Sequence, residues 1–218
     1  MNKLTLKNII LVITYIAILT TGIIFKQPFY RILPLFVSVI VMTLQSSANR
    51  FGYLFGGINA LLYAVVYMNL GAYATALSGL VFSFPMQLIT FIYWNKRSYE
   101  KSVVFKKMSR NLRLFTAATF LCACAVCFCI LESVGSLYAV LDTLSSIIGI
   151  YVTILTMLAF IEYSYLWPIN GVLNIFFNVQ MMLNEPSQIT YLIYAIYSLY
   201  CVMLAFVNVR KLYKKQNT

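Results

Sequence analysis

The chain has 218 residues, of which 62% are hydrophobic and only 10% are charged, and its formal net charge is +11. Soluble domains contain about 45–50% apolar and about 25% charged residues, so this chain has too few charges to cover a water-exposed surface. The same figures exclude a disordered, fibrous or disulfide-rich secreted chain. They indicate an integral membrane protein with little room for a soluble domain.

Eight stretches are apolar and long enough for bilayer-crossing helices, which need roughly 20 residues each. Turn and polar residues separate them, for example Lys26-Gln27-Pro28 and Asn184-Glu185-Pro186. No window shows the strict alternation of outer-membrane barrel strands. The sequence therefore predicts an all-α membrane protein with eight transmembrane helices. The expected helices are residues 8–25, 32–47, 51–69, 72–94, 113–131, 137–161, 163–183 and 187–208.

The distribution of Lys and Arg orients these helices. If the N-terminus is cytoplasmic, all but two of the 16 basic residues fall inside, and only Lys26 and Arg31 fall outside. We therefore expect a multi-pass protein of the cell membrane with both termini in the cytoplasm. The basic stretch from Lys96 to Arg113 then lies at the headgroups, where attraction to anionic lipid is worth about 1 kcal/mol per cation. No aromatic-interleaved motif favours nucleic acid as a partner.

The sequence offers little for catalysis or metal binding. It contains no His and only five carboxylates, of which Asp142 alone is expected within a span. Cys122, Cys124, Cys127 and Cys129 fall on two faces of one helix, so we interpret them as small buried hydrophobes rather than metal ligands. Paired carboxylates, a Gly-rich phosphate loop and a nucleophile elbow are missing from the chain. We therefore predict no enzyme activity, no metal site and no cofactor.

Neutral polar and aromatic side chains gather on particular faces of the expected helices. Asn59 and Tyr63 share a face at i and i+4, and Ser83 and Gln87 share another around Pro85. The seventh span carries one continuous polar stripe, and the eighth is rich in tyrosine. The stripe consists of Trp167, Asn170, Asn174 and Asn178, and the tyrosines are Tyr191, Tyr194, Tyr197 and Tyr200.

Hydrogen bonding between helices would explain single members of this set. As a group they suit a neutral or cationic aromatic solute, because rings stack, amides bind polar edges and π-faces attract positive charge. We therefore predict a solute pathway in which Trp167 stacks on the ligand, amides bind it and tyrosines close the walls. The predicted binding residues are Asn59, Tyr63, Gln87, Trp167, Asn170, Asn174, Tyr194 and Tyr197.

Two parts of the chain match each other in spacing. Residues 35–96 superimpose on 147–208 at an offset of 112, which pairs three spans with three. One span (113–131) lies between them, so both repeats have the same orientation, a known transporter plan with the site between the halves. We expect a single membrane domain in four parts. These are an extra N-terminal helix (1–28), repeat one (29–96), a cytoplasmic loop with a linker helix (97–136) and repeat two (137–212).

Several segments share a pattern with one transporter family. They are Gly56-Gly57-Ile58-Asn59-Ala60-Leu61-Leu62-Tyr63-Ala64, Phe84-Pro85-Met86-Gln87, Tyr93-Trp94-Asn95-Lys96, Leu141-Asp142-Thr143-Leu144, Glu162 with Leu166-Trp167, and the Tyr-rich last span. In them the chain resembles the PnuC family of vitamin transporters. The resemblance implies a three-one-three helix arrangement like that of SWEET sugar transporters, here after one extra helix, and a homotrimer. It also implies facilitated uptake of nicotinamide riboside, which cytoplasmic phosphorylation then traps.

The chain departs from the family pattern at several positions. Gly79, Gly171 and Tyr197 stand where family members usually carry Asn, and Ser164 stands where Trp is expected. Thiamine and riboflavin therefore stay open as substrates. A capture subunit of an ATP-driven vitamin importer and a structural protein also stay open. Few ionisable residues fall within the spans, which favours transport without ion coupling, and Asp142 is the exception that a proton-coupling test must address.

Overall fold

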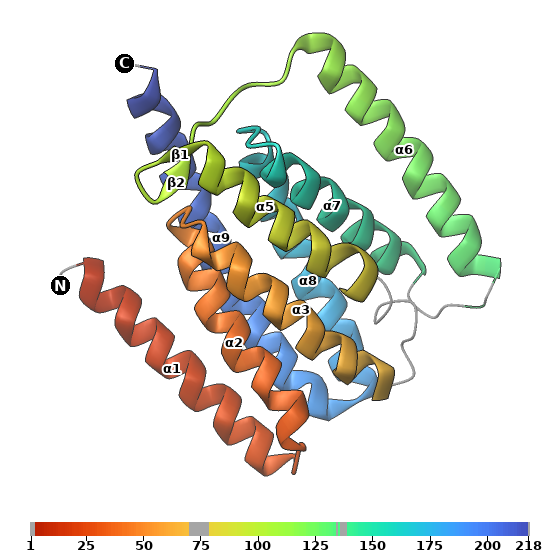
Figure 1. The fold of residues 1–218 in the computed structure, drawn as a ribbon. Coiled ribbons are helices and arrows are strands. Elements are labelled where there is room, and N and C mark those ends of the chain that lie inside the picture. The colour runs from red at the N-terminus through yellow and green to blue at the C-terminus, as the bar shows by residue number, and fades with distance from the viewer. Residues whose placement is uncertain (1–2, 70–78, 134, 136–138, 218) are drawn as a thin grey trace.

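The structure is a computed structural model that describes residues 3–69, 79–133, 135 and 139–217. Over this part of the chain it contains eight α-helices (Figure 1). They are α1 (Lys3–Ile24), α2 (Phe29–Ser46), α3 (Phe51–Asn69), α5 (Phe84–Lys96), α6 (Arg110–Ser133), α7 (Ala139–Met157), α8 (Tyr163–Asn184) and α9 (Ile189–Gln216). Short elements join them, namely the π-helical turn η1 (Gly79–Ser83), the 3-10 turn η2 (Pro186–Gln188) and the antiparallel strands β1 (Ser98–Tyr99) and β2 (Ser102–Val103).

Within the described part of the chain, five segments are long and apolar enough to cross a membrane. They are Leu6–Ile24, Phe29–Ser46, Arg110–Ser133, Ala139–Met157 and Pro186–Gln216. Each of the eight predicted spans has a helix over its described residues, although residues 72–78 of the fourth lie outside the described residues. The helices α3, α5 and α8 are not among the five segments. The prediction that the sixth span extends to residue 161 was wrong. Its helix ends at Met157, because Ala159 adopts a left-handed backbone conformation with φ of 58° and reverses the chain.

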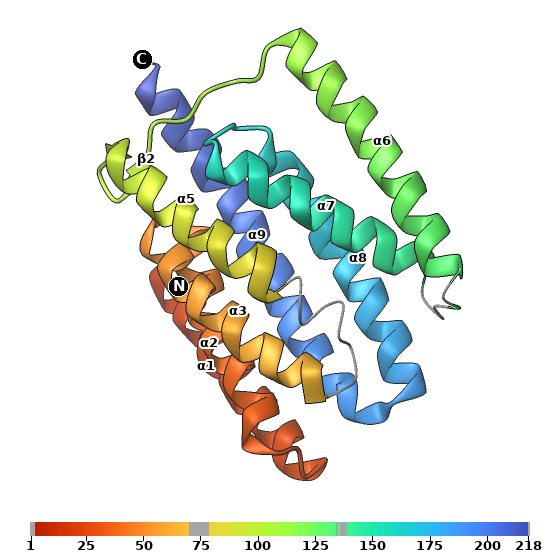
Figure 2. The same ribbon diagram turned by 45° about the vertical axis from the view of Figure 1, so that its right-hand side comes forward.

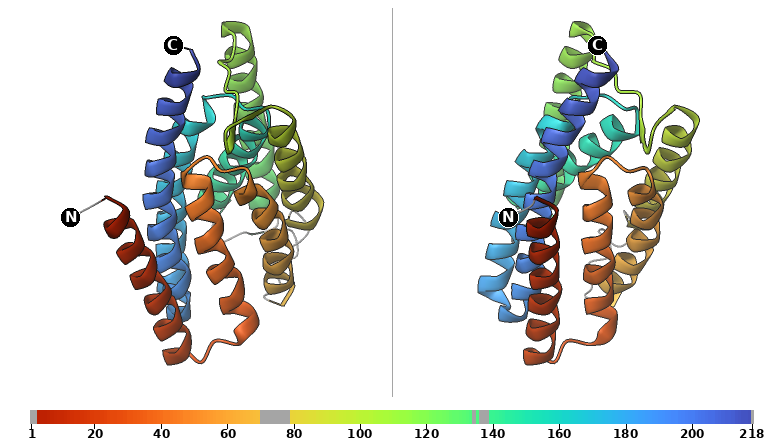
Figure 3. Two further views of the ribbon diagram at one scale, coloured as in Figure 1. Left: turned by 60° about the vertical axis from the view of Figure 1, so that its left-hand side comes forward. Right: turned by 90° about the vertical axis from the view of Figure 1, so that its left-hand side faces the viewer.

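Six helices form a closed ring, in which each packs against the next in the order α2, α3, α5, α7, α8, α9 and back to α2. We call α2, α3 and α5 the first half of the ring, and α7, α8 and α9 the second half. The halves therefore meet along two seams, α5–α7 and α9–α2. Two helices lie outside the ring: α6 packs against α7 (Figures 1 and 2), and α1 packs against α2 and α9 (Figure 3).

A buried aromatic cluster, the aromatic floor, fills the ring at the end where the β-hairpin and the C-terminal part of α9 lie. It consists of Tyr53, Trp94, Phe105 and Tyr163, with ring centroids 4.6 Å apart for Tyr53 and Trp94 and 5.7 Å apart for Trp94 and Phe105. Trp94 and Tyr163 are completely buried. Phe105 comes from the loop between α5 and α6, so a segment outside the helices completes this packing.

That loop is fastened across the end of the ring. The Lys106 N–H donates to the Ala159 carbonyl at 3.0 Å, and the Ile161 N–H donates to the Lys106 carbonyl at 2.9 Å. At the end of α9, the Gln216 side chain accepts from the Phe105 N–H and donates to the Val103 carbonyl, both at 2.9 Å. The loop thus connects the ends of α5, α7 and α9.

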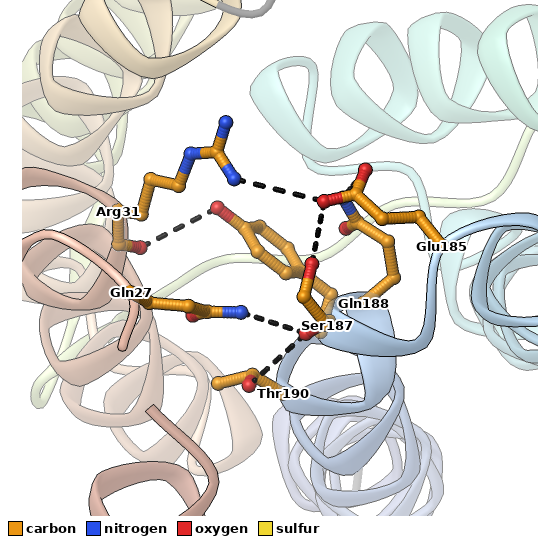
Figure 4. A network of polar contacts seen from close by, with 7 residues as sticks. Gln27, Arg31, Glu185, Ser187, Gln188 and Thr190 are labelled. Atoms are coloured by element: carbon orange, nitrogen blue, oxygen red, sulfur yellow. Dashed lines mark hydrogen bonds and ion pairs between the residues drawn. The ribbon is translucent and has the colours of Figure 1, made fainter. Parts of the chain in front are cut away.

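Polar residues fasten the opposite end of the α9–α2 seam (Figure 4). Gln27 Nε2 donates to the Ser187 carbonyl at 2.6 Å, and Arg31 lies 3.8 Å from Glu185 Oε1. Hydrogen bonds from Ser187 and Gln188, followed by the nearby Arg31 charge, hold the pKa of Glu185 below its usual value. We call these five residues the outer clamp, because they join the α1–α2 turn to the α8–α9 turn.

Candidate functional site

A cavity of about 450 Å³ lies inside the ring, and all six ring helices, with η1, contribute to its wall. This volume falls within the range of roughly 300–1,000 Å³ that is typical of small-molecule sites. Its described lining consists of uncharged residues only, namely small, apolar, hydroxyl, amide and aromatic side chains. The cavity is therefore suited to a ligand recognised through hydrogen bonds and ring contacts rather than through ion pairs.

Seven of the eight predicted binding residues line this cavity. They are Asn59 and Tyr63 of α3, Gln87 of α5, Trp167, Asn170 and Asn174 of α8, and Tyr194 of α9. Tyr197, which we expected in the wall, lies elsewhere. It is 3% exposed, and its hydroxyl is 2.6 Å from Thr43 Oγ1 of α2. Tyr197 is three residues after Tyr194 on α9, so its side chain points away from the cavity and into the α9–α2 seam.

A chain of hydrogen bonds fixes the amide on α3. Asn59 Nδ2 donates to Ser38 Oγ of α2 at 2.6 Å, and Ser38 Oγ donates to the Tyr63 hydroxyl at 3.1 Å. Asn59 is 6% exposed and Ser38 is 1% exposed, so both bonds are shielded from water. Ser38 therefore supports two of the predicted binding residues from the neighbouring helix.

Three side-chain amides on three helices each keep a buried oxygen without a partner in the described chain. These oxygens are Asn59 Oδ1, Gln87 Oε1 and Asn170 Oδ1. An unpaired buried acceptor costs about 1–3 kcal/mol. Because the oxygens are inaccessible in this arrangement, a ligand reaches them only when an amide reorients. A ligand with several donors would then recover part of this cost.

The rest of the polar stripe on α8 is occupied by bonds to other parts of the protein. Asn174 Nδ2 donates to the Asn170 carbonyl at 2.8 Å, and Asn174 Oδ1 accepts from Ser145 Oγ of α7 at 3.2 Å. Asn178 Nδ2 similarly donates to the Asn174 carbonyl at 2.7 Å. Asn174 thus has a structural bond at each end of its amide, although it lines the cavity.

Two other groups of residues singled out in the sequence lie away from the cavity. Our interpretation of the α6 cysteines as buried was wrong: Cys122 and Cys129 are exposed, because α6 lies outside the ring and contains no buried residue. Among the described residues, no group of three or more His, Cys, Asp or Glu could hold a metal ion. Asp142 lies in the first turn of α7, where it accepts from Ser146 Oγ at 3.1 Å, and it is not part of the cavity lining.

Sequence reasoning missed the contribution of α2 to the site. Ser38, Val41, Met42 and Gln45 all line the cavity. Their spacing of i, i+3, i+4 and i+7 defines one face of a helix. Two polar residues at the ends of this face, in a mostly apolar span, were the signal that could have identified them.

Comparisons with known proteins identify the family and the fold. A family model described as nicotinamide mononucleotide transporter matches residues 28–208. A search of curated proteins found no significant match. Among solved structures, the crystal structure of the vitamin B3 transporter PnuC is similar, with a TM-score of 0.80 and 19% sequence identity, over 97% of this chain and 93% of that one.

These matches confirm the resemblance to the PnuC family and the prediction of a multi-pass, all-α membrane protein. The family model covers most of the chain, and it describes transporters rather than enzymes. The structural similarity extends the shared fold to nearly the whole chain. The chain belongs to the nicotinamide mononucleotide transporter family.

Proposed function

We propose that the protein carries a vitamin B3 riboside, by default nicotinamide riboside, across the cell membrane through the central cavity. Transport is facilitated diffusion without ion coupling, and cytoplasmic phosphorylation traps the solute. The observation that carries the proposal is the uncharged lining of the cavity, with amides on α3, α5 and α8 and an indole on α8. A pyridinium ring would stack on Trp167 with a cation–π contribution, and ribose hydroxyls would supply donors to the amides.

The same lining favours a riboside over a mononucleotide. A phosphate group is bound in proteins by Arg, Lys or a helix N-terminus, and no Arg or Lys is among the described residues of the lining. Burying a charged phosphate without such partners would be costly. The proposed binding residues are the seven that line the cavity, with Tyr197 omitted.

We also propose that the ring consists of two parallel three-helix repeats joined by α6, with α1 as an additional N-terminal helix. Support comes from the first helix of each half, since α2 and α7 end in the same way. Ala48 and Ala159 both adopt left-handed conformations, with φ of 51° and 58°. Each is followed by an N–H that bonds five residues back, from Asn49 to the Leu44 carbonyl and from Phe160 to the Leu155 carbonyl.

The proposed membrane placement puts both termini in the cytoplasm, as the basic residues predict. Lys7 Nζ and Asn208 Nδ2 both contact Ser46, at 3.3 and 2.8 Å, so the first part of α1 and the last part of α9 lie at one end of the ring. The proposed homotrimer rests on the family resemblance. The apolar α6, which contains no buried residue, leaves a free surface for such an assembly.

Binding to the purified protein tests the substrate. A ligand that binds only the folded state raises the melting temperature by mass action. We expect nicotinamide riboside to raise it in detergent, and nicotinamide mononucleotide at the same concentration to leave it unchanged. Stabilisation by the mononucleotide alone would refute the charge argument, whereas stabilisation by thiamine or riboflavin alone would replace the substrate and keep the site.

Flux through the purified protein separates a carrier from a capture subunit. Liposomes that contain only this protein and no ATP should equilibrate the riboside with their interior. Binding without equilibration would favour the subunit of an ATP-driven importer. The absence of any saturable ligand in both assays would leave only the structural role.

A further inference from the structure

At the end of the ring where the aromatic floor lies, a side chain donates to a main-chain carbonyl across each seam. The α9–α2 seam is also crossed by the contact between the Thr43 and Tyr197 hydroxyls. On the α5–α7 seam, Trp94 Nε1 donates to the Thr156 carbonyl at 2.9 Å. On the α9–α2 seam, Asn208 Nδ2 donates to the Ser46 carbonyl at 2.8 Å. Trp94 and Ser46 are 0% exposed and Thr156 is 5% exposed, so the Trp94 bond is shielded from water, while Asn208 is half-buried.

The two bonds occupy corresponding places in the two halves. In each case the donor is a side chain near the cytoplasmic end of the third helix of one half. The acceptor is a main-chain carbonyl in the last turn of the first helix of the other half. At the repeat offset of 112 residues, Trp94 corresponds to residue 206 and Thr156 to residue 44, so donor and acceptor are both displaced by two residues in the same direction. An indole and an amide thus make equivalent contacts in the two halves, two residues apart in the repeat register.

The acceptors are suited to a bond that forms and breaks. Carbonyls in the last turn of a helix have no partner within the helix, so water can replace the side-chain donor when the seam opens. The Thr156 carbonyl also accepts from the Ala159 N–H at 2.9 Å, so it keeps one partner when Trp94 leaves. A hydrogen bond exchanged with water has a small net contribution of about 0.5–1.5 kcal/mol. Such a bond favours the closed arrangement without locking it.

The Trp94–Thr156 bond lies at the edge of the cavity. Thr156 lines the cavity, and Trp94 packs edge-on against Tyr53, which lines it too. Separation of Trp94 from Thr156 would therefore part the aromatic floor at the α5–α7 seam. Separation of Asn208 from Ser46, together with loss of the Thr43–Tyr197 contact, would release the other seam.

We propose that these two hydrogen bonds are paired latches of the cytoplasmic gate, and that release of solute into the cytoplasm requires both seams to open. The proposal rests on the proposed cytoplasmic position of this end of the ring. The loop from Phe105 to Met108 lies over the aromatic floor. The main chain of this loop is bonded to the α7–α8 turn, so the loop moves with the floor when the seam opens.

Labelling from one face of the membrane tests the latches without any substrate. All five cysteines are replaced by alanine, and Thr153→Cys on the cavity wall introduces one reporter thiol. A membrane-impermeant maleimide is then added to the cytoplasmic face of sealed vesicles. We expect Asn208→Leu and Trp94→Phe each to speed labelling about 2- to 12-fold, the factor equivalent to one hydrogen bond. The double variant should show the product of the two factors, because the seams are separate.

Matched variants distinguish a latch from ordinary packing. Asn208→Gln keeps an amide donor and should label close to the parent rate, and Asn95→Leu replaces an exposed amide of α5 and should have no effect. A lowered melting temperature with unchanged labelling would overturn the latches and leave only a structural role. Faster labelling from the opposite face alone would overturn the cytoplasmic assignment, whatever the substrate proves to be.

Discussion

Ser38→Ala tests whether the cavity wall is held by the hydrogen bonds between α2 and α3. The variant removes the acceptor of Asn59 Nδ2 at 2.6 Å and the donor to the Tyr63 hydroxyl at 3.1 Å. Asn59 Oδ1 already lacks a partner in the described chain, so the whole amide would then be buried without a bond. A buried polar group left unsatisfied costs about 1–3 kcal/mol. We expect this loss of stability in the empty protein.

The loss can be measured by thermal unfolding in detergent. For a chain of this size, 1 kcal/mol corresponds to roughly 2–4 °C in Tm, so the expected decrease is about 2–12 °C. Ser198→Ala is the matched control, because Ser198 lines the cavity but makes no hydrogen bond within the described part of the chain. Its Tm should be unchanged.

A second variant separates the lost bonds from simple loss of packing. Removal of both partners of a buried hydrogen bond costs less than removal of one. Asn59→Leu combined with Ser38→Ala should therefore be less destabilised than the sum of the single variants, with a coupling energy of about 0.5–3 kcal/mol. Additive effects, or a Ser38→Ala protein as stable as the parent, would refute the reasoning.

Three further predictions concern the cavity, the outer clamp and the carboxylate on α7. Trp167→Ala should weaken riboside binding by about 1–3 kcal/mol in a titration if the ring stacks on the ligand, and an unchanged affinity would remove that role. Because the outer clamp lowers the pKa of Glu185, its stabilisation is present above the usual glutamate pKa of about 4.3 and is lost as pH falls through the lowered value. Glu185→Gln should reduce the decrease in Tm over this acid range, and an identical pH profile would contradict the assignment. Asp142→Asn should leave liposome uptake unchanged with or without a pH gradient, because this carboxylate lies outside the cavity lining; loss of a gradient dependence would instead assign proton coupling to it.

The helices and much of the cavity could be predicted from the sequence, because both depend on local patterns. Apolar length determines the spans, and the i, i+4 spacing of Asn59 and Tyr63 places them on one face. The direction in which a side chain points is harder to predict for a residue at the edge of such a face. Tyr197 is three residues from Tyr194, yet it binds Thr43 in a seam rather than lining the cavity.

Other features depend on contacts that no local pattern records. The end of α7 is determined by Ala159, a residue type that seldom adopts a left-handed conformation. The exposure of Cys122 depends on the position of α6 outside the ring, and apolar composition alone does not distinguish a lipid-facing helix from a buried one. Ser38 contributes through a partner on another helix, so its role becomes visible only when α2 and α3 are seen together.

The uncharged lining of the cavity has an electrical consequence. If no charged side chain of the protein crosses the membrane field during a transport cycle, the membrane potential acts only on the charge of the solute. One elementary charge moved through 100 mV is worth about 2.3 kcal/mol, which corresponds to a concentration ratio of about 50. A cationic riboside would therefore accumulate in a cell with a negative interior before any phosphorylation, while a neutral vitamin of similar shape would only equilibrate.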